Sequence, residues 1–105
     1  HAVGPRWLDG ERNEPQLLCD AYSNAIMKAN HVGVKTISFP NISTGVYGFP
    51  RQLAAEIAIG TILSTLPQYD CVEEVFFVCR DDENYLIYKE ILSNINDPKI
   101  KIQIE

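Results

Sequence analysis

The chain has 105 residues, of which 46% are hydrophobic, 10% aromatic and 22% charged, and its formal net charge is −5. This length suits a single domain, and the composition is that of a globular protein rather than a disordered or fibrous one. The acidic surplus lies in residues 70–83, where six acids accompany one arginine, and no cluster of Lys or Arg elsewhere offsets it. A nucleic-acid partner is therefore not expected, because its phosphates would be repelled.

The first predicted helix covers residues 15–32, where apolar side chains recur at helical spacing. Pro15 suits the first turn of this helix, and Gly33 suits the left-handed residue that ends it. Before the helix, residues 1–3 are expected to end a strand, and the polar residues 8–15 are expected to form a surface loop.

Strands and helices alternate through the rest of the chain. The β-branched and aromatic residues 34–39 predict a strand, and residues 50–66 predict a helix. The apolar run 74–79 predicts a strand buried on both faces, and Asp81 or Asp82 can cap a helix that runs to about residue 96. Alternating isoleucines in 99–105 predict a last strand. This order predicts an α/β fold in which parallel strands are joined by right-handed connections. The ligand site of such a fold lies beyond the carboxyl ends of the strands.

The loop over residues 40–50 carries the strongest chemical signal. Gly45 leaves room for the close approach of a ligand, and successive N–H groups before a helix make an anion cradle, to which Ser43 and Thr44 add hydroxyl donors. The loop has no Lys or Arg and no nucleotide-binding glycine motif, which favours a diphosphate over a transferable γ-phosphate. The alternative is a plain strand-to-helix turn, but Tyr47, a large aromatic residue between two glycines, favours a ligand surface.

The run from Ile37 to Pro50 resembles the phosphate-loop signature of the macro domains, the ADP-ribose-binding family also known for Appr-1″-p processing. The form of this signature is Ser-Thr-Gly, a hydrophobic residue, an aromatic residue and Gly. Further segments that match the family are residues 1–7, 17–26, 54–58 and 75–88. The resemblance extends over residues 1 to about 95. It is nearest to the bacterial-type branch that includes ADP-ribosyl hydrolases and O-acetyl-ADP-ribose deacetylases.

The resemblance implies a three-layer α/β/α fold with a mixed, largely parallel sheet, in which residues 1–105 form the C-terminal part of one domain. Backbone N–H groups of residues 43–47 would hold the diphosphate, and Tyr47 would pack against the distal ribose. Residues 79–84 would approach the adenosine. Relatives place an aromatic ring at the position of Arg80, whose guanidinium can stack on a base or face solvent. The implied ligand-binding residues are Ile42, Ser43, Thr44, Gly45, Val46, Tyr47, Gly48 and Arg80.

No residue of the chain is assigned a catalytic role, because the resemblance places the family's catalytic residues in a preceding part of the domain. His31 is expected near a helix end, Glu56 on a helix surface and Cys79 in a buried strand. No side chains have the spacing of a metal site, and no cofactor is expected. Three cysteines without a disulfide framework favour a cytoplasmic protein, and no apolar run is long enough to span a membrane.

Three functions stay open on the sequence. The first is an enzyme that, when complete, acts on ADP-ribosyl or O-acetyl-ADP-ribose derivatives. The second is a non-catalytic module that recognises ADP-ribose, and the third is a structural fragment without a ligand. Residues 1–105 are expected to need the preceding segment of the domain or a self-associated copy as a partner, since an apolar sheet face and a strand edge would otherwise stay uncovered.

Overall fold

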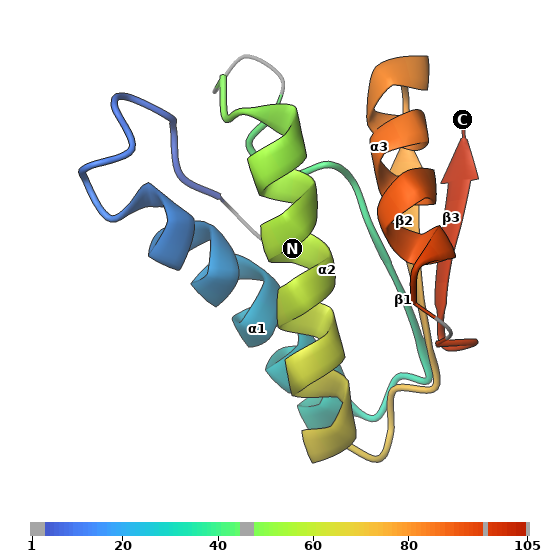
Figure 1. Cartoon of the computed structure of the whole chain (residues 1–105). Coiled ribbons are helices and arrows are strands. Elements are labelled where there is room, and N and C mark those ends of the chain that lie inside the picture. The colour runs from blue at the N-terminus through green and yellow to red at the C-terminus, as the bar shows by residue number, and fades with distance from the viewer. Residues whose placement is uncertain (1–3, 45–47, 96, 105) are drawn as a thin grey trace.

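The computed structural model describes residues 4–44, 48–95 and 97–104, and Figure 1 shows their arrangement. In chain order the elements are α1 (Glu14–Val32), β1 (Thr36–Phe39), α2 (Arg51–Thr65), the 3-10 turn η1 (Leu66–Gln68), β2 (Glu74–Cys79), α3 (Asp82–Ser93) and β3 (Ile100–Ile104). This order confirms the predicted alternation of helices and strands. The strand end predicted for residues 1–3 lies outside the described residues. Among the described residues, no helix has the length and apolarity that crossing a membrane requires.

The ends of α1 are formed by the residues that the sequence singles out. Pro15 lies in the first turn, and Gly33 ends the helix with a φ of 81°. The N–H groups of Gly33 and Val34 donate to carbonyl oxygens of the last turn of α1. Because Val34 still belongs to this helix cap, β1 begins at Thr36, two residues after the predicted start of the strand.

The three strands form one parallel sheet in the order β1-β2-β3, with Ile37 beside Val75 and Phe77 beside Ile102. Right-handed crossovers between successive neighbouring strands place α2 and α3 on the same face of the sheet. Helix α1 packs against α2, and Figure 1 shows the three helices on one side of the sheet. The described residues therefore supply the sheet and one helix layer of the expected α/β/α fold.

Strand β2 is fully buried on one face only, as expected if residues 1–105 by themselves leave one apolar sheet face uncovered. Val75, Phe77 and Cys79 are buried beneath the helices, whereas Phe76 and Val78 on the opposite face are partly exposed. The reason is that the helices among the described residues pack on the first face. A continuous apolar run indicates that both faces of a strand can be buried, but it does not indicate which chain segment covers each face.

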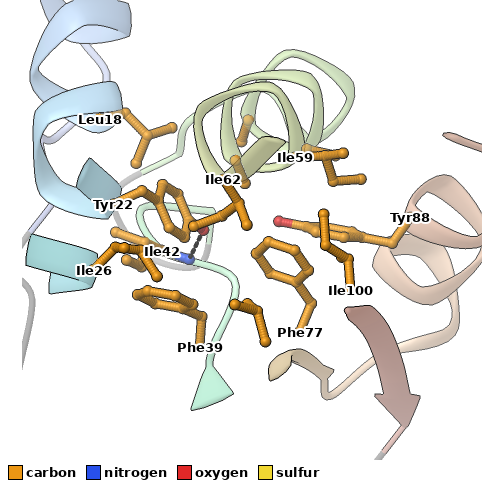
Figure 2. Packing of buried hydrophobic residues seen from close by; sticks show 14 of the residues in the cluster. Leu18, Tyr22, Ile26, Phe39, Ile42, Ile59, Ile62, Phe77, Tyr88 and Ile100 are labelled. Carbon is orange, nitrogen blue, oxygen red and sulfur yellow. Dashed lines mark hydrogen bonds between the residues drawn. The ribbon is translucent and has the colours of Figure 1, made fainter. Parts of the chain in front are cut away.

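The core lies between the sheet and the helices and is rich in aromatic rings (Figure 2). The ring of Tyr22 on α1 meets Phe39 at 5.1 Å and Phe77 at 6.2 Å between ring centroids, in both cases edge to face. Tyr88 on α3 lies 5.0 Å from Phe77. Side chains from α1, α3 and two strands thus meet at the end of β1. The core therefore supports the loop that begins there.

Candidate functional site

A cavity of about 440 Å³ opens at the carboxyl ends of β1 and β2, where the sequence predicts the ligand site. It lies between the loop that follows β1 and the loop that follows β2, next to the amino-terminal end of α3. Its lining residues are Pro40, Asn41, Thr44, Val78, Arg80, Asp81 and Asn84. The fold therefore brings together two of the predicted ligand-binding residues, Thr44 and Arg80, from distant positions in the sequence.

The loop after β1 turns sharply at Ser43, whose φ of 67° lies in the left-handed region that residues with a Cβ seldom adopt. Thr44 is buried, and its hydroxyl donates to the Asn41 carbonyl oxygen at 3.0 Å, within the loop. The N–H of Phe49 donates to the Ser43 carbonyl oxygen at 2.9 Å, which joins the two ends of the loop. The remaining predicted residues Gly45, Val46 and Tyr47 lie outside the described residues.

Ile42 and Gly48, at the two ends of the predicted ligand loop, have different surroundings. The side chain of Ile42 is buried in the core, and its N–H donates to the hydroxyl of Tyr22 at 3.3 Å (Figure 2). Gly48 is exposed and has a φ of 71°, and no described atom lies within 4 Å of the place that a Cβ would take. Ile42 therefore supports the loop from the core side, whereas Gly48 borders it on the solvent side.

Gly4 allows the chain to pass close to the start of this loop. A Cβ on Gly4 would lie 2.3 Å from Ile42 Cγ2 and 2.3 Å from Ser43 Oγ, far inside contact distance. The Ser43 hydroxyl is itself buried without a hydrogen-bond partner among the described residues. Gly4 is thus needed for packing as well as for the predicted turn. No local sequence pattern indicates this contact, because it joins distant segments.

The loop after β2 is organised by Asp81, which caps α3 as predicted. One carboxylate oxygen of Asp81 accepts the backbone N–H of Asn84 at 2.7 Å, and the other accepts its side-chain N–H at 3.2 Å. The backbone bond from Asn84 lowers the pKa of Asp81. Asn84 is buried, and its Oδ1 has no partner among the described residues. Arg80 is exposed beside the cavity, and Asn84 is a lining residue that the sequence analysis did not single out.

An ion pair joins the amino-terminal ends of α2 and α3 near the cavity. Arg51 Nη1 lies 2.7 Å from Glu83 Oε2, and both side chains are largely exposed. Arg51 is the first residue after the loop over 40–50, so it is the cation nearest to that loop in the sequence. Glu83 offsets the positive charge of Arg51. Backbone N–H groups are therefore a more important attraction for an anion at this loop than the side chain of Arg51.

The side chains considered for acid–base or nucleophilic chemistry do not line the cavity. His31 and Glu56 are exposed on α1 and α2. Cys79 is fully buried, which raises the pKa of its thiol, and its sulfur accepts a bond from the Asn41 amide at 3.6 Å. Over residues 4–44, 48–95 and 97–104, no group of three His, Cys, Asp or Glu side chains could hold a metal ion.

A second loop with clustered N–H groups, residues 8–13, closes around the buried carboxylate of Glu14. Its Oε2 accepts the N–H groups of residues 8–10 at 2.8–3.1 Å, and its Oε1 accepts the N–H of Arg12 at 2.8 Å. Burial alone raises the pKa of this carboxyl group, but the four backbone bonds lower it to about 2. The predicted surface loop is therefore an anion nest that holds the protein's own side chain.

Comparison with known proteins assigns the chain to a family. Residues 1–58 match the model of the Macro domain family. A Macro domain-containing protein of an Acinetobacter species is 79% identical over 104 residues, which are 99% of this chain and 57% of that protein. A protein of Escherichia fergusonii named O-acetyl-ADP-ribose deacetylase is 50% identical over 97 residues, 92% of this chain and 55% of the relative. The chain thus spans about half the length of these relatives.

Solved structures share the fold described above. The macrodomain of Oceanobacillus iheyensis with ADP has a TM-score of 0.81 at 39% identity, covering 89% of this chain and 48% of that one. The Trypanosoma brucei macrodomain in complex with ADP-ribose has a TM-score of 0.72 at 29% identity, covering 74% of this chain and 34% of that one. These neighbours confirm the expected macro-domain fold class. Since the family model matches more than half of the length of this chain, the chain belongs to the Macro domain family.

Proposed function

We propose that this chain binds ADP-ribose at the carboxyl ends of β1 and β2, with its diphosphate in the phosphate loop (residues 42–48). The observation that carries the proposal is the form of this loop. Its described part starts at buried Ile42, turns at Ser43 with positive φ, and reaches the cavity at Thr44. Such a turn before a helix offers backbone N–H groups to an anion. The name of the Escherichia relative and the ADP-ribose complex of the Trypanosoma neighbour support the same ligand.

In this proposal the N–H groups of residues 43–47 hold the diphosphate, and Tyr47 packs against the distal ribose. Arg80 lies at the adenosine end, where its flat guanidinium can stack on the base. The placement of Thr44 and Arg80 around one cavity supports this division of the ligand between the two loops.

For the complete protein we propose hydrolysis of ADP-ribosyl compounds, O-acetyl-ADP-ribose among them, in line with the names of several relatives. A second candidate is a module that recognises ADP-ribose without turnover. It is favoured by the cavity lining, because the titratable groups there, among the described residues, are Arg80 and Asp81. Both carboxylate oxygens of Asp81 already accept bonds from Asn84, which leaves Asp81 poorly suited to proton transfer.

Location and partners are part of the same proposal. A cytoplasmic location is supported by the free thiols of Cys19, Cys71 and Cys79. We further propose that the sheet face with Phe76 and Val78 is covered in the complete protein, by a preceding segment or by a second copy. The partial exposure of these two side chains supports that part of the proposal.

Isothermal titration of ADP-ribose into the purified protein tests the proposed ligand. We expect binding by the parent, and we expect Gly45→Val to abolish it while the helix content stays nearly unchanged, because Gly45 is expected to leave room for the diphosphate. Gly60→Ala, on α2 and outside both loops, is the control and should bind as the parent does. A parent without measurable affinity for ADP-ribose contradicts the proposal. Product analysis with O-acetyl-ADP-ribose then separates an enzyme from a recognition module.

A further inference from the structure

The hydroxyl of Tyr22 lies directly under the first residue of the phosphate loop. Tyr22 projects from α1, and its oxygen accepts the N–H of Ile42 at 3.3 Å. Both residues are buried, and Figure 2 shows this bond inside the aromatic core. Without the hydroxyl, the N–H of Ile42 would be a buried donor with no partner, which is costly. The bond therefore ties the loop to a helix that is distant in sequence.

The ring of Tyr22 is held in place by close packing in the core. The side chain is 1% exposed and packs edge to face on Phe39 and Phe77, which belong to the two strands that precede the cavity. Burial, and then the neighbouring hydroxyl of Tyr88, raise the pKa of Tyr22 well above its usual value, so the group stays protonated. The hydroxyl is thus a fixed and neutral acceptor beneath the loop.

The position of this bond determines where the loop leaves the core. The N–H of Ile42 points to Tyr22, the chain reverses at Ser43 with a φ of 67°, and Phe49 closes the loop by donating to the Ser43 carbonyl oxygen. Ser43 and Thr44, with the next N–H groups of the loop, follow directly from this starting point. Building on the function proposed above, we propose that Tyr22 is a positioning residue, whose hydroxyl orients the phosphate loop for the diphosphate without touching the ligand.

The variant Tyr22→Phe tests this inference because it keeps the ring and removes the hydroxyl. We expect the affinity for ADP-ribose to fall about 3- to 10-fold, the range of one net hydrogen bond. The affinity for adenosine, which has no diphosphate, should stay unchanged in an NMR titration. Tyr69→Phe is the matched control, since Tyr69 is a partly buried ring ahead of β2, at the other end of the sheet. It should change neither affinity.

Amide hydrogen exchange supplies a second readout that needs no variant. In the parent, ADP-ribose should increase the protection of the Ile42 amide and adenosine should not, because positioning and binding are reciprocal. Unchanged protection, an unchanged affinity of Tyr22→Phe for ADP-ribose, or equal losses for ADP-ribose and adenosine each overturn the inference. A parent that binds no ADP-ribose refutes the proposed function instead. Thermal melting shows whether each variant is folded at the titration temperature.

Discussion

Two loops of this chain differ in whether they hold a carboxylate of their own. The loop over residues 8–13 surrounds the carboxylate of Glu14, which accepts four of its N–H groups. The loop over residues 40–50 contains no Asp or Glu at all. An anion nest filled by its own chain stabilises the fold. The proposed phosphate loop has no carboxylate of its own that could compete with a ligand. The comparison therefore separates a loop that holds an internal anion from a loop that we propose to hold the anion of a ligand.

The largest effect should come from removing the internal anion. Glu14→Gln replaces a carboxylate oxygen with an amide donor, which faces backbone N–H groups instead of accepting from them. We expect Tm at pH 7 to fall by roughly 10 °C, measured by thermal melting. Glu11→Gln, in the same loop but exposed, is the control and should leave Tm nearly unchanged. Equal values of Tm for the two variants would contradict the claim that the carboxylate of Glu14 stabilises the loop over residues 8–13.

The same carboxylate predicts a pH dependence. Folding lowers the pKa of Glu14 from 4.5 to about 2, so its stabilisation is complete above pH 4.5 and is lost as the pH falls through about 2. The parent should therefore lose stability across this window, and Glu14→Gln should lose less. Thermal melting of both proteins from pH 6 to pH 2 measures the difference. Parallel curves would show that other carboxyl groups dominate acid unfolding.

The next effect concerns the support of the binding loop. Gly4→Ala places a Cβ 2.3 Å from Ile42 Cγ2 and Ser43 Oγ, so these side chains must shift. We expect a loss of about 1–3 kcal/mol in the free energy of unfolding, together with weaker ADP-ribose binding. In the control Gly60→Ala, the new Cβ meets no described atom within 4 Å beyond its own helix backbone and chain neighbours. This variant should gain about 0.5–1 kcal/mol, because alanine favours a helix. Chemical denaturation measures whether each variant loses or gains free energy of unfolding.

Arg80→Ala should weaken ligand binding without affecting the fold. If Arg80 stacks on adenine, ADP-ribose should lose about 1–3 kcal/mol of binding free energy, whereas ribose 5-phosphate, which has no base, should lose little. Arg12→Ala, an exposed arginine in the loop over 8–13, is the control and should alter neither affinity. Equal weakening of both ligands by Arg80→Ala would indicate a general charge effect. Calorimetric titration with both ligands makes the measurement.

The smallest effect should come from the helix cap beside the cavity. Asp81→Ala removes the acceptor for the Asn84 N–H and should cost about 1 kcal/mol of stability. Asp82→Ala, one residue further on and also exposed, lacks this bond and is the control. Denaturant unfolding at pH 7 compares the two. A larger loss for Asp82→Ala would contradict the assigned cap.

Local patterns predicted most of the fold. The helix over 15–32, the strand over 74–79 and the cap at one of Asp81 and Asp82 agree with the structure to within a few residues, because periodicity and capping act between near neighbours in sequence. The second face of β2 is partly exposed in residues 1–105, and its burial in the complete protein stays a prediction, since the segment that covers a face is a tertiary property. The family resemblance was confirmed by the comparisons.

The candidate site was predicted less completely. The family resemblance implied that Arg80 and Thr44 bind the ligand, and the structure brings both to one cavity, although their contact with a ligand stays a prediction. The sequence did not indicate the bond between Tyr22 and Ile42 or the contact of Gly4 with the loop, because each joins distant segments through one atom pair. The nest around Glu14 was also missed, since its polar residues look the same as those of any surface loop.

The acidic residues 81–83 at the start of α3 have a consequence for the ionic-strength dependence of binding. Asp81 lines the cavity and the other two follow it in the first turn of α3, in a chain of net charge −5, while the proposed ligand carries a negatively charged diphosphate. Long-range repulsion therefore opposes the approach of the ligand, and in our proposal the ligand is held by short-range N–H contacts and by the stacking of Arg80. Added salt screens the repulsion more than the contacts. Association should then become faster as the salt concentration rises, the reverse of a phosphate site built from lysines and arginines.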